Sequence, residues 1–325
     1  MTSYDELQNE ILYMELLDLA EDPSTPVEQL GELAYADYED VREAVATNPS
    51  TPSWLLDELG FDSSSFVRSQ VAEIVRTLPE TLTMLASDRN YGVRYTVAHN
   101  PSAPPEALSV LARDPEISVR LAVALHRSTP PHALEKLAAD RDGRVAGPAV
   151  AHPAIPTCVL EAWASDESSS KRLSAAANPA LSEVLIESLA VDSDERVRGN
   201  VAGNRSAPIV LLERLAVDSA AEVRAGVASN PSIPSSLLDV LADDPVSLVR
   251  QCAAHNGVIS EATAWKLSND PETKVRRSLA INASIPIKLL LKFAESSDPS
   301  LRRTAEWRIQ ELRDDPQSAF DVSAE

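Results

Sequence analysis

The chain has 325 residues, a formal net charge of −21 and only two cysteines. So negative a charge argues against binding to nucleic acid or an anionic membrane surface, since both require clusters of Lys and Arg. No apolar run reaches the roughly 20 residues that span a bilayer, two cysteines make no disulfide framework, and the acidic N-terminus lacks a basic signal region. We therefore expect a cytoplasmic protein.

The first 21 residues form the first predicted element. Leu7, Ile11, Met14 and Leu17 recur at helical spacing, which predicts an amphipathic helix that caps the elements after it. Residues 22–307 then divide into eleven repeats of 26 residues. Residues 308–325 are expected to extend the last helix and to end in a disordered tail from Asp314.

The dipeptide Val-Arg marks the period of these repeats. It recurs at multiples of 26 residues, and related pairs occupy the remaining steps. Self-similarity at this period is typical of a solenoid. The dipeptides are Val41-Arg42, Val67-Arg68, Val93-Arg94, Val119-Arg120, Val197-Arg198, Val223-Arg224, Val249-Arg250 and Val275-Arg276, and the related pairs are Val145-Ala146, Lys171-Arg172 and Leu301-Arg302.

Each repeat predicts two helices. In Thr51-Pro52, the Thr side chain is expected to cap the first helix and the Pro to be its first residue. Leu56 and Leu59 then form an apolar stripe, and an Asp closes the loop to the second helix. We expect that second helix to be short, and either α or 3₁₀. No run predicts a strand, so the predicted fold is an all-α solenoid.

The repeat Asn-Pro-x-x-Pro…Leu-x-x-Leu-Ala-x-Asp…Val-Arg-x-x-Val-Ala resembles the leucine-rich-repeat variant family over residues 22–307. That resemblance implies a right-handed α-solenoid of paired α- and 3₁₀-helices and no common activity. The Asp-x₅-Arg spacing also resembles HEAT repeats. The best-known family member has an iron–sulfur module held by four Cys, whereas this chain has only Cys158 and Cys252. We therefore expect no cofactor.

The Arg row has two interpretations: a phosphate-binding stripe, or a structural ladder in which each Arg grips an Asp of its own or a neighbouring repeat. The planar guanidinium suits carboxylates, and Asp recurs at the matching position, so we favour the ladder. Its expected members are Arg68, Arg94, Arg120, Arg198, Arg224 and Arg250 with Asp88, Asp114, Asp192, Asp218 and Asp244.

The repeat at residues 126–151 departs from the rule. Ala146 replaces the ladder Arg, and Gly143, Gly147 and Pro148 share its second helix. This pattern indicates either local drift or a hinge over residues 141–153. His126 and His152 replace the Asn that opens most repeats, but no set of four zinc ligands is present, so we predict no metal site.

Aromatic residues indicate a binding surface. Nine of the fourteen lie within residues 1–95, and residues 1–41 carry twelve acids without a Lys or Arg. Exposed aromatic side chains beside acidic ones predict a hot spot for a basic partner. Its predicted members are Tyr35, Tyr38, Trp54, Phe61, Phe66, Tyr91, Tyr95 and Trp265.

Function is predicted from this surface, because no catalytic motif is present. We expect a non-catalytic scaffold that binds a protein or basic peptide through its acidic, aromatic N-terminal third and concave face. One alternative is a HEAT-like enzyme or enzyme accessory, of the DNA-base glycosylase or lyase-chaperone type. Another is a structural protein that self-associates weakly head to tail, since nine Lys and Arg residues lie in residues 271–313.

Overall fold

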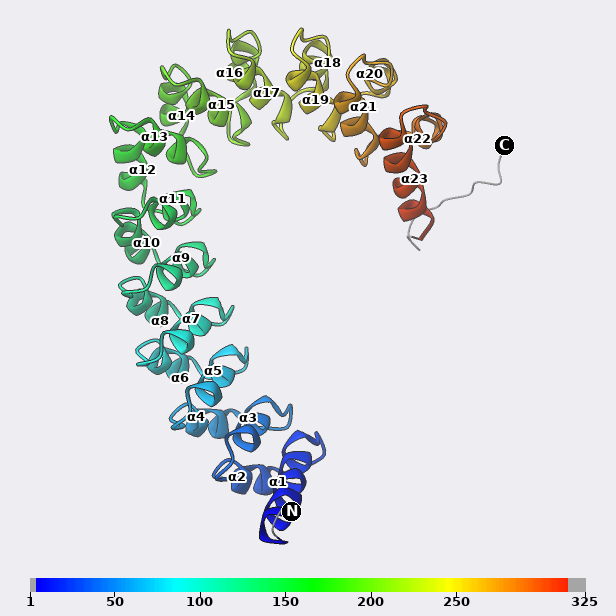
Figure 1. Ribbon diagram of the computed structural model, residues 1–325. Helices are drawn as coiled ribbons and strands as arrows, with labels where there is room; N and C mark the ends of the chain where they lie inside the picture. Colours follow the sequence, from blue (N-terminus) through cyan, green and yellow to red (C-terminus); the bar gives the residue numbers. More distant parts are fainter. Residues whose placement is uncertain (1–3, 315–325) are drawn as a thin grey trace. The chain divides into compact units, whose positions relative to one another are not determined.

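The computed structural model describes residues 4–314, so most of the predicted disordered tail lies outside the described residues. These residues form 23 helices and no strand, which confirms the all-α prediction (Figure 1). The chain divides into two compact units, Met1–Val159 and Leu160–Glu325, called here the N-terminal and C-terminal units. Each is described by itself.

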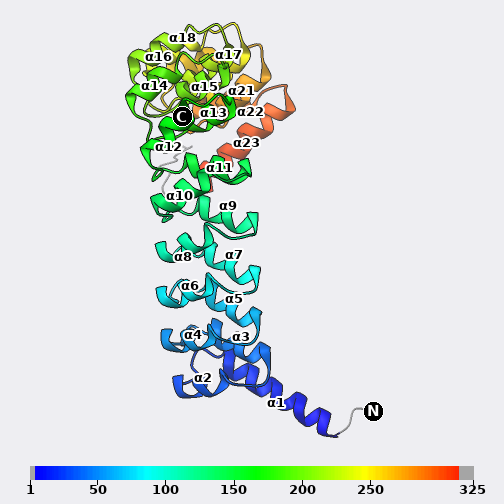
Figure 2. The same ribbon diagram turned by 90° about the vertical axis from the view of Figure 1, so that its left-hand side faces the viewer.

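After the cap helix α1 (Tyr4–Glu21), each 26-residue repeat contributes a first helix, called A, and a second helix, called B. In the N-terminal unit the A helices lie along one side and the B helices along the other (Figure 2). The A helices are α2 (Val27–Leu33), α4 (Ser53–Leu59), α6 (Pro79–Leu85), α8 (Pro105–Leu111), α10 (Pro131–Ala138), α12 (Thr157–Ala164), α14 (Glu183–Leu189), α16 (Ile209–Leu215), α18 (Ser235–Leu241), α20 (Glu261–Leu267) and α22 (Ile287–Ala294). The B helices are α3 (Glu39–Thr47), α5 (Ser65–Glu73), α7 (Tyr91–His99), α9 (Ile117–Leu125), α11 (Gly143–Ala151), α13 (Ser169–Ala176), α15 (Glu195–Gly203), α17 (Ala221–Ser229), α19 (Ser247–His255), α21 (Thr273–Ala280) and α23 (Pro299–Asp314).

The B helices correct the expectation that the second helix is short and perhaps 3₁₀. They are α-helices, and α7 has nine residues against seven in α6. The loop before them is compact because the Asp side chain turns the backbone, as where Asp88 Oδ1 accepts a bond of 2.7 Å from the Asn90 N–H. Such a turn leaves room for two full helical turns within the repeat.

The Thr-Pro pair also differs from its prediction. Pro52 occupies the cap position of α4 rather than its first turn, and no side chain caps that helix. Instead, the Thr77 hydroxyl donates back to the Val71 carbonyl at 2.7 Å, and Thr129 donates likewise to Val123 at 2.6 Å. These hydroxyls add a second hydrogen bond to carbonyls at the ends of the preceding B helices, which each also accept one backbone N–H.

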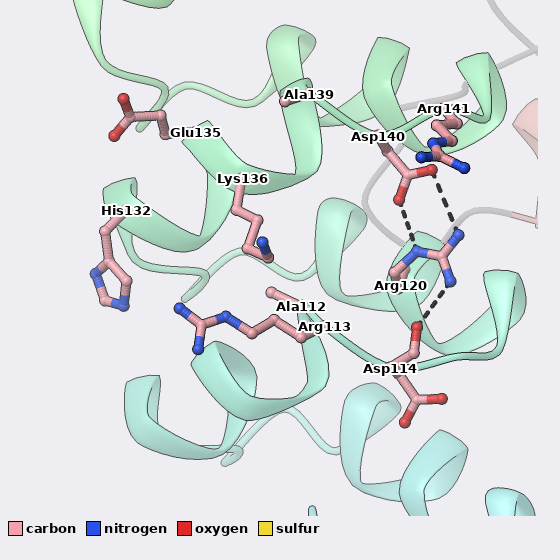
Figure 3. Close-up of a pocket in the computed structure, with 10 residues that line it drawn as sticks. All are labelled: Ala112, Arg113, Asp114, Arg120, His132, Glu135, Lys136, Ala139, Asp140 and Arg141. Atoms are coloured by element: carbon pink, nitrogen blue, oxygen red, sulfur yellow. Dashed lines mark hydrogen bonds and ion pairs between the residues drawn. The ribbon is translucent and has the colours of Figure 1, made fainter.

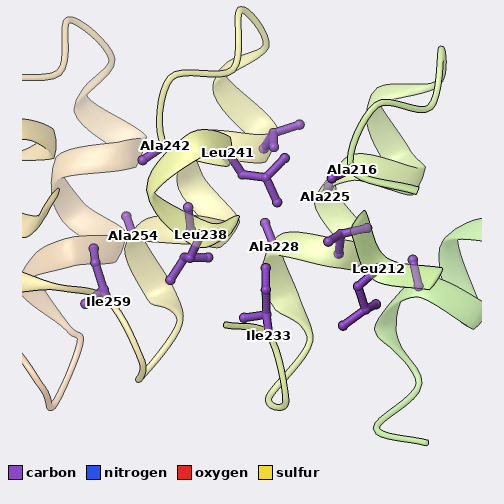
Figure 4. Close-up of a cluster of buried hydrophobic side chains, with 14 of the residues drawn as sticks. Leu212, Ala216, Ala225, Ala228, Ile233, Leu238, Leu241, Ala242, Ala254 and Ile259 are labelled. Carbon is purple, nitrogen blue, oxygen red and sulfur yellow. The ribbon is translucent and has the colours of Figure 1, made fainter. Parts of the chain in front are cut away.

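The apolar core is continuous within each unit because every A helix supplies Leu side chains and the B helices supply mainly Val and Ala. In the C-terminal unit, Leu238 and Leu241 of α18 lie against Ala228 and Ala254 of the neighbouring B helices (Figure 4). Close packing there requires glycine at one crossing: a Cβ on Gly226 would lie 2.4 Å from the Gly199 carbonyl oxygen.

Arginine forks join consecutive repeats. Each ladder Arg donates from Nε and Nη2 to both carboxylate oxygens of the Asp 20 residues later, with Nε–Oδ2 distances of 2.5 to 2.9 Å. Nη1 also reaches the loop carbonyl six residues earlier, as from Arg68 to Asp62 at 2.7 Å. The pairs are Arg42–Asp62, Arg68–Asp88, Arg94–Asp114, Arg120–Asp140, Arg172–Asp192, Arg198–Asp218, Arg224–Asp244 and Arg250–Asp270.

These contacts hold the ladder carboxylates in their charged form. The Arg172 guanidinium, helped by the Asp194 N–H, holds the pKa of Asp192 below its usual range although partial burial opposes this. The ladder is interrupted at Ala146, where a methyl group stands in place of the Arg guanidinium. In this repeat α11 nevertheless continues as one helix through Pro148.

A second, asparagine ladder runs beside the first. The Asn that opens a repeat is buried, and its Nδ2 donates to two carbonyls of the preceding repeat, as from Asn230 to Ala202 at 2.7 Å and to Asn204 at 2.8 Å. Its Oδ1 accepts from the N–H two residues later, that of Ser232, at 2.8 Å. The other members with these bonds are Asn48, Asn100, Asn204, Asn256 and Asn282.

Two histidines occupy this ladder position in the N-terminal unit. The Nδ1 atoms of His126 and His152 accept backbone N–H groups at 3.2 and 3.1 Å, and His126 Nε2 lies 2.9 Å from the Asn100 carbonyl. This arrangement requires neutral rings with the proton on Nε2. Burial lowers the pKa of His152 below 6.5, while a hydrogen bond with the His126 backbone opposes the shift.

The Arg ladder predicts a large effect of Arg68→Ala. It removes both bonds to Asp88 and leaves a buried carboxylate without its counter-charge, so the free energy of unfolding should fall by about 2–4 kcal/mol. Urea denaturation followed by circular dichroism measures the change. Arg144→Ala is the control, because Arg144 is exposed and pairs only with Asp142 of its own turn. Equal effects of the two variants would contradict the ladder's role.

The asparagine ladder predicts that Asn230→Asp is strongly destabilising. The substitution places a carboxylate oxygen against two carbonyl oxygens in a buried site, which should cost about 3 kcal/mol. Asn269→Asp is the matched control, since Asn269 is exposed: a carboxylate keeps the bond from Lys292 and loses only the 3.3 Å bond from Nδ2 to the Trp265 carbonyl. Thermal melting should separate the two variants; a melting temperature lowered by neither would refute this account.

His152 predicts a pH dependence. In the unfolded chain it takes up a proton near its ordinary pKa of 6.5, whereas the folded chain resists protonation. Its contribution to stability is thus present above 6.5 and is lost as pH falls below that value toward the lowered folded pKa. His152→Asn restores the common ladder residue and should flatten the melting temperature between about pH 7 and pH 5.5. An unchanged slope in the variant would show that other groups cause it.

Candidate protein-binding surfaces

Exposed apolar side chains form a strip on consecutive B helices of the N-terminal unit. Phe66 of α5 is 68% exposed, Tyr91 and Tyr95 of α7 are 60% and 41% exposed, and Ile117 and Leu125 of α9 are 37% and 65% exposed. Tyr91 and Tyr95 lie one helical turn apart, and Ile117 is the equivalent of Tyr91 one repeat later. These five residues are called the aromatic strip.

Hydrogen bonds fix the helices beneath the strip. Ser69 Oγ of α5 lies 3.0 Å from Thr96 Oγ1 of α7, and Gln70 Nε2 donates to Glu43 Oε1 of α3 at 2.7 Å. The Tyr95 ring lies 4.2 Å from the His99 ring, between centroids. The strip is therefore presented on helices that are already joined to one another, which lowers the entropic cost of binding.

The acidic neighbour of the strip is α3, which carries Glu39, Asp40 and Glu43. Asp40 accepts a bond of 2.9 Å from the Tyr13 hydroxyl of α1, and this bond raises the pKa of Tyr13. The rings of Tyr13 and Tyr38 lie 5.1 Å apart. Tyr38, predicted as a partner-binding residue, is thus half-buried in the contact between the cap helix and the first B helix.

Tyr35 and Phe61 lie on a different surface, the edge formed by the loops from A to B helices. They line a hollow of about 700 Å³ together with Asp37, Arg42 and Glu58. The Tyr35 hydroxyl donates to Glu58 at 2.6 Å, which raises the pKa of Tyr35. The hollow combines exposed aromatic rings with acidic groups above the Arg42–Asp62 pair.

The remaining two predicted aromatic residues are separate again. Trp54 projects from α4, on the A side, and is 53% exposed near Gly31 of α2. Trp265 belongs to α20 in the C-terminal unit, where its Nε1 donates to Glu261 and Lys292 lies 5.7 Å from its ring. Of the eight predicted residues, only Phe66, Tyr91 and Tyr95 thus share the strip.

Sequence reasoning missed Ile117 and Leu125. The signal was available, because Ile117 occupies the repeat position of Tyr91, and Leu125 that of His99, on the exposed face of the B helix. A search limited to aromatic residues passes over aliphatic ones at the same position. An alignment of the repeats with one another would reveal them.

Within residues 4–314, no three His, Cys, Asp or Glu side chains gather in a way that could hold a metal ion. Cys158 and Cys252 are free thiols, and they lie in different units. No helix in this range is both long and apolar enough to cross a bilayer.

Comparison with known proteins supports the repeat assignment. A model of the leucine-rich repeat variant domain matches residues 14–72, and a model of the leucine-rich repeat variant matches residues 91–116, 118–142 and 221–246. No curated protein matches the chain.

Several solved structures are similar. One, described as a leucine-rich repeat variant with a novel repetitive structural motif, is 24% identical over 69% of this chain and 88% of its own, with a TM-score of 0.38. An engineered protein is 17% identical over 92% and 94%, with a TM-score of 0.27. A computationally designed armadillo repeat protein for modular peptide recognition is 15% identical over 95% and 94%, with a TM-score of 0.11. The chain therefore contains leucine-rich-repeat variant repeats in these four segments, and its 26-residue period continues beyond them.

Proposed function

We propose that this protein is a non-catalytic binding scaffold whose N-terminal unit takes up a basic segment of a partner protein. The observation that carries the proposal is the aromatic strip, in which three consecutive B helices expose large apolar side chains at neighbouring positions. Single exposed apolar residues are ordinary on protein surfaces, whereas a contiguous group indicates a surface that a partner covers.

Apolar contact and electrostatic attraction would both contribute to binding. Phe66, Tyr91 and Tyr95 offer large, rigid rings of the kind that dominate interface energies. Glu39 and Glu43 of α3 supply negative charge beside them, and a net charge of −21 attracts a basic segment from a distance. The expected ligand is therefore a peptide that presents apolar side chains on one face and Lys or Arg at its end over α3.

A second copy of this chain is the other candidate partner. On the B side of the C-terminal unit, exposed Lys274 and Arg277, with Ile281 and Thr304, line a hollow of about 470 Å³. Arg303 and Trp307, which is 59% exposed, belong to the neighbouring α23. This basic and apolar surface complements the acidic, aromatic one, which favours head-to-tail association of copies.

The strip predicts the effect of Tyr91→Ser with Tyr95→Ser. Affinity for a labelled amphipathic peptide of Lys and Leu should fall at least about tenfold, because two buried anchors are lost. Fluorescence anisotropy measures the change. Phe61→Ser is the control, since Phe61 is 70% exposed in the same unit but lies off the strip.

Light scattering of the protein without peptide identifies the case in which the partner is a second copy, because its mass would then rise with concentration and fall with added salt. If the double Tyr variant bound the peptide as tightly as Phe61→Ser and the parent, the strip would not be the binding surface.

A further inference from the structure

The loop edge carries a recurring side-chain contact between neighbouring repeats. It joins the second residue after an A helix to the sixth residue of the next A helix, 23 positions later. The Tyr35 hydroxyl donates to Glu58 at 2.6 Å, Lys266 pairs with Asp243, and Lys292 Nζ donates to Asn269 Oδ1 at 2.8 Å. In each case a donor meets an acceptor, so the fold places these two side chains within reach of one another.

Arg113 and Lys136 occupy the same two positions at the end of α8 and on α10, and both are cations. Both side chains are exposed, and within residues 4–314 neither forms an ion pair. Two donors thus occupy positions that elsewhere hold a donor and an acceptor, and within the described residues this contact has no protein acceptor. An anionic group from a partner would supply one.

These cations line a hollow of about 800 Å³ (Figure 3). Arg113, Lys136 and His132 lie toward one side of it and Arg141 toward the other. The charges of the two ladder residues Arg120 and Asp140 in the lining cancel, because the two side chains form an ion pair. His132 Nε2 is engaged at 2.8 Å with Ser109 Oγ.

The charge that remains in the lining is positive. Arg113, Lys136 and Arg141 stand against the single carboxylate of Glu135, after Asp114 is assigned to its ladder partner Arg94. The equivalent hollow three repeats earlier is lined instead by Tyr35, Asp37, Glu58 and Phe61. The repeat architecture thus forms the hollow, and the local residues give it an opposite charge in a chain of net charge −21.

We propose that this hollow binds an acidic segment of a partner protein, with neighbouring Asp or Glu carboxylates bridging Arg113 and Lys136. The Lys266–Asp243 pair shows how such a contact forms within the chain, because its Lys occupies the position of Lys136 and its carboxylate that of Arg113. An Arg fork and a Lys ammonium side by side suit two carboxylates, and Arg141 extends the positive surface beyond them. This site is independent of the aromatic strip, since it lies on the loop edge and selects the opposite charge.

The test uses the full chain and a labelled peptide of glutamates, with a peptide of glutamines as the matched probe. At roughly 0.1 M salt the Debye length is about 10 Å, so the overall negative charge is largely screened while contacts within the hollow persist. Fluorescence anisotropy should show binding of the glutamate peptide alone. Arg113→Gln with Lys136→Gln should weaken it at least about tenfold, through loss of two charge-assisted contacts.

A charge reversal sharpens the test. Arg113→Asp recreates the Lys266–Asp243 arrangement within the hollow, so it should abolish peptide binding and raise the melting temperature. Arg214→Gln is the control: Arg214 is an exposed cation at the position of Lys136, but it already pairs with Glu187 at 2.6 Å. This variant should bind the peptide as the parent does.

Circular dichroism melts of each variant establish that the fold is retained, as expected for exposed side chains. Unchanged affinity in the double Gln variant would overturn the proposal, and so would equal binding of the glutamine peptide or a loss of binding in Arg214→Gln as large as in the double variant. None of these results bears on the aromatic strip, whose residues are left intact.

Discussion

The bond between each ladder Arg and the Asp of the next repeat is the constraint on which the rest of the structure depends. A repeat of 26 residues buries too little apolar surface to be stable alone, so its neighbours complete the core. Stacking leaves loop carbonyls and helix ends partly buried, and these need partners. The guanidinium meets this need at one point, because it grips a carboxylate of the next repeat and a carbonyl of its own loop, as Arg68 does with Asp88 and Asp62.

The asparagine ladder completes the same task at the C-terminal ends of the B helices. Asn230 uses both amide hydrogens and its oxygen, so the buried turn between repeats has its polar groups satisfied. Together the ladders hold successive repeats in one position relative to each other within a unit. The ladders use the Arg, Asp and Asn residues that recur from repeat to repeat. The remaining surface positions take no part in the ladders and are free to vary.

That freedom accounts for the two opposite surfaces on the N-terminal unit. The exposed positions of the B helices carry rings and aliphatic side chains in α5, α7 and α9, with acids in α3. The loop edge changes from aromatic and acidic at Tyr35 and Glu58 to basic at Arg113 and Lys136. In a repeat solenoid of this kind the surface chemistry can differ from one part of the chain to another, since the exposed residues of each repeat can vary without disturbing its ladders.

The amino-acid sequence by itself determined the helical repeat, its period and the Arg–Asp spacing, because these depend on local propensity and on a pattern repeated many times. It did not determine the length of the B helices, since the Asp turn that starts them early is a side-chain contact. Nor did it reveal that Asn230 joins repeats, because an Asn before a Pro is read as a turn signal.

Only the tertiary structure assigned the eight candidate aromatic residues to different surfaces and placed Arg113 and Lys136 together in one hollow. The reason is physical: a repeat position defines a face of one helix, but which faces of successive helices form one surface depends on how the repeats stack.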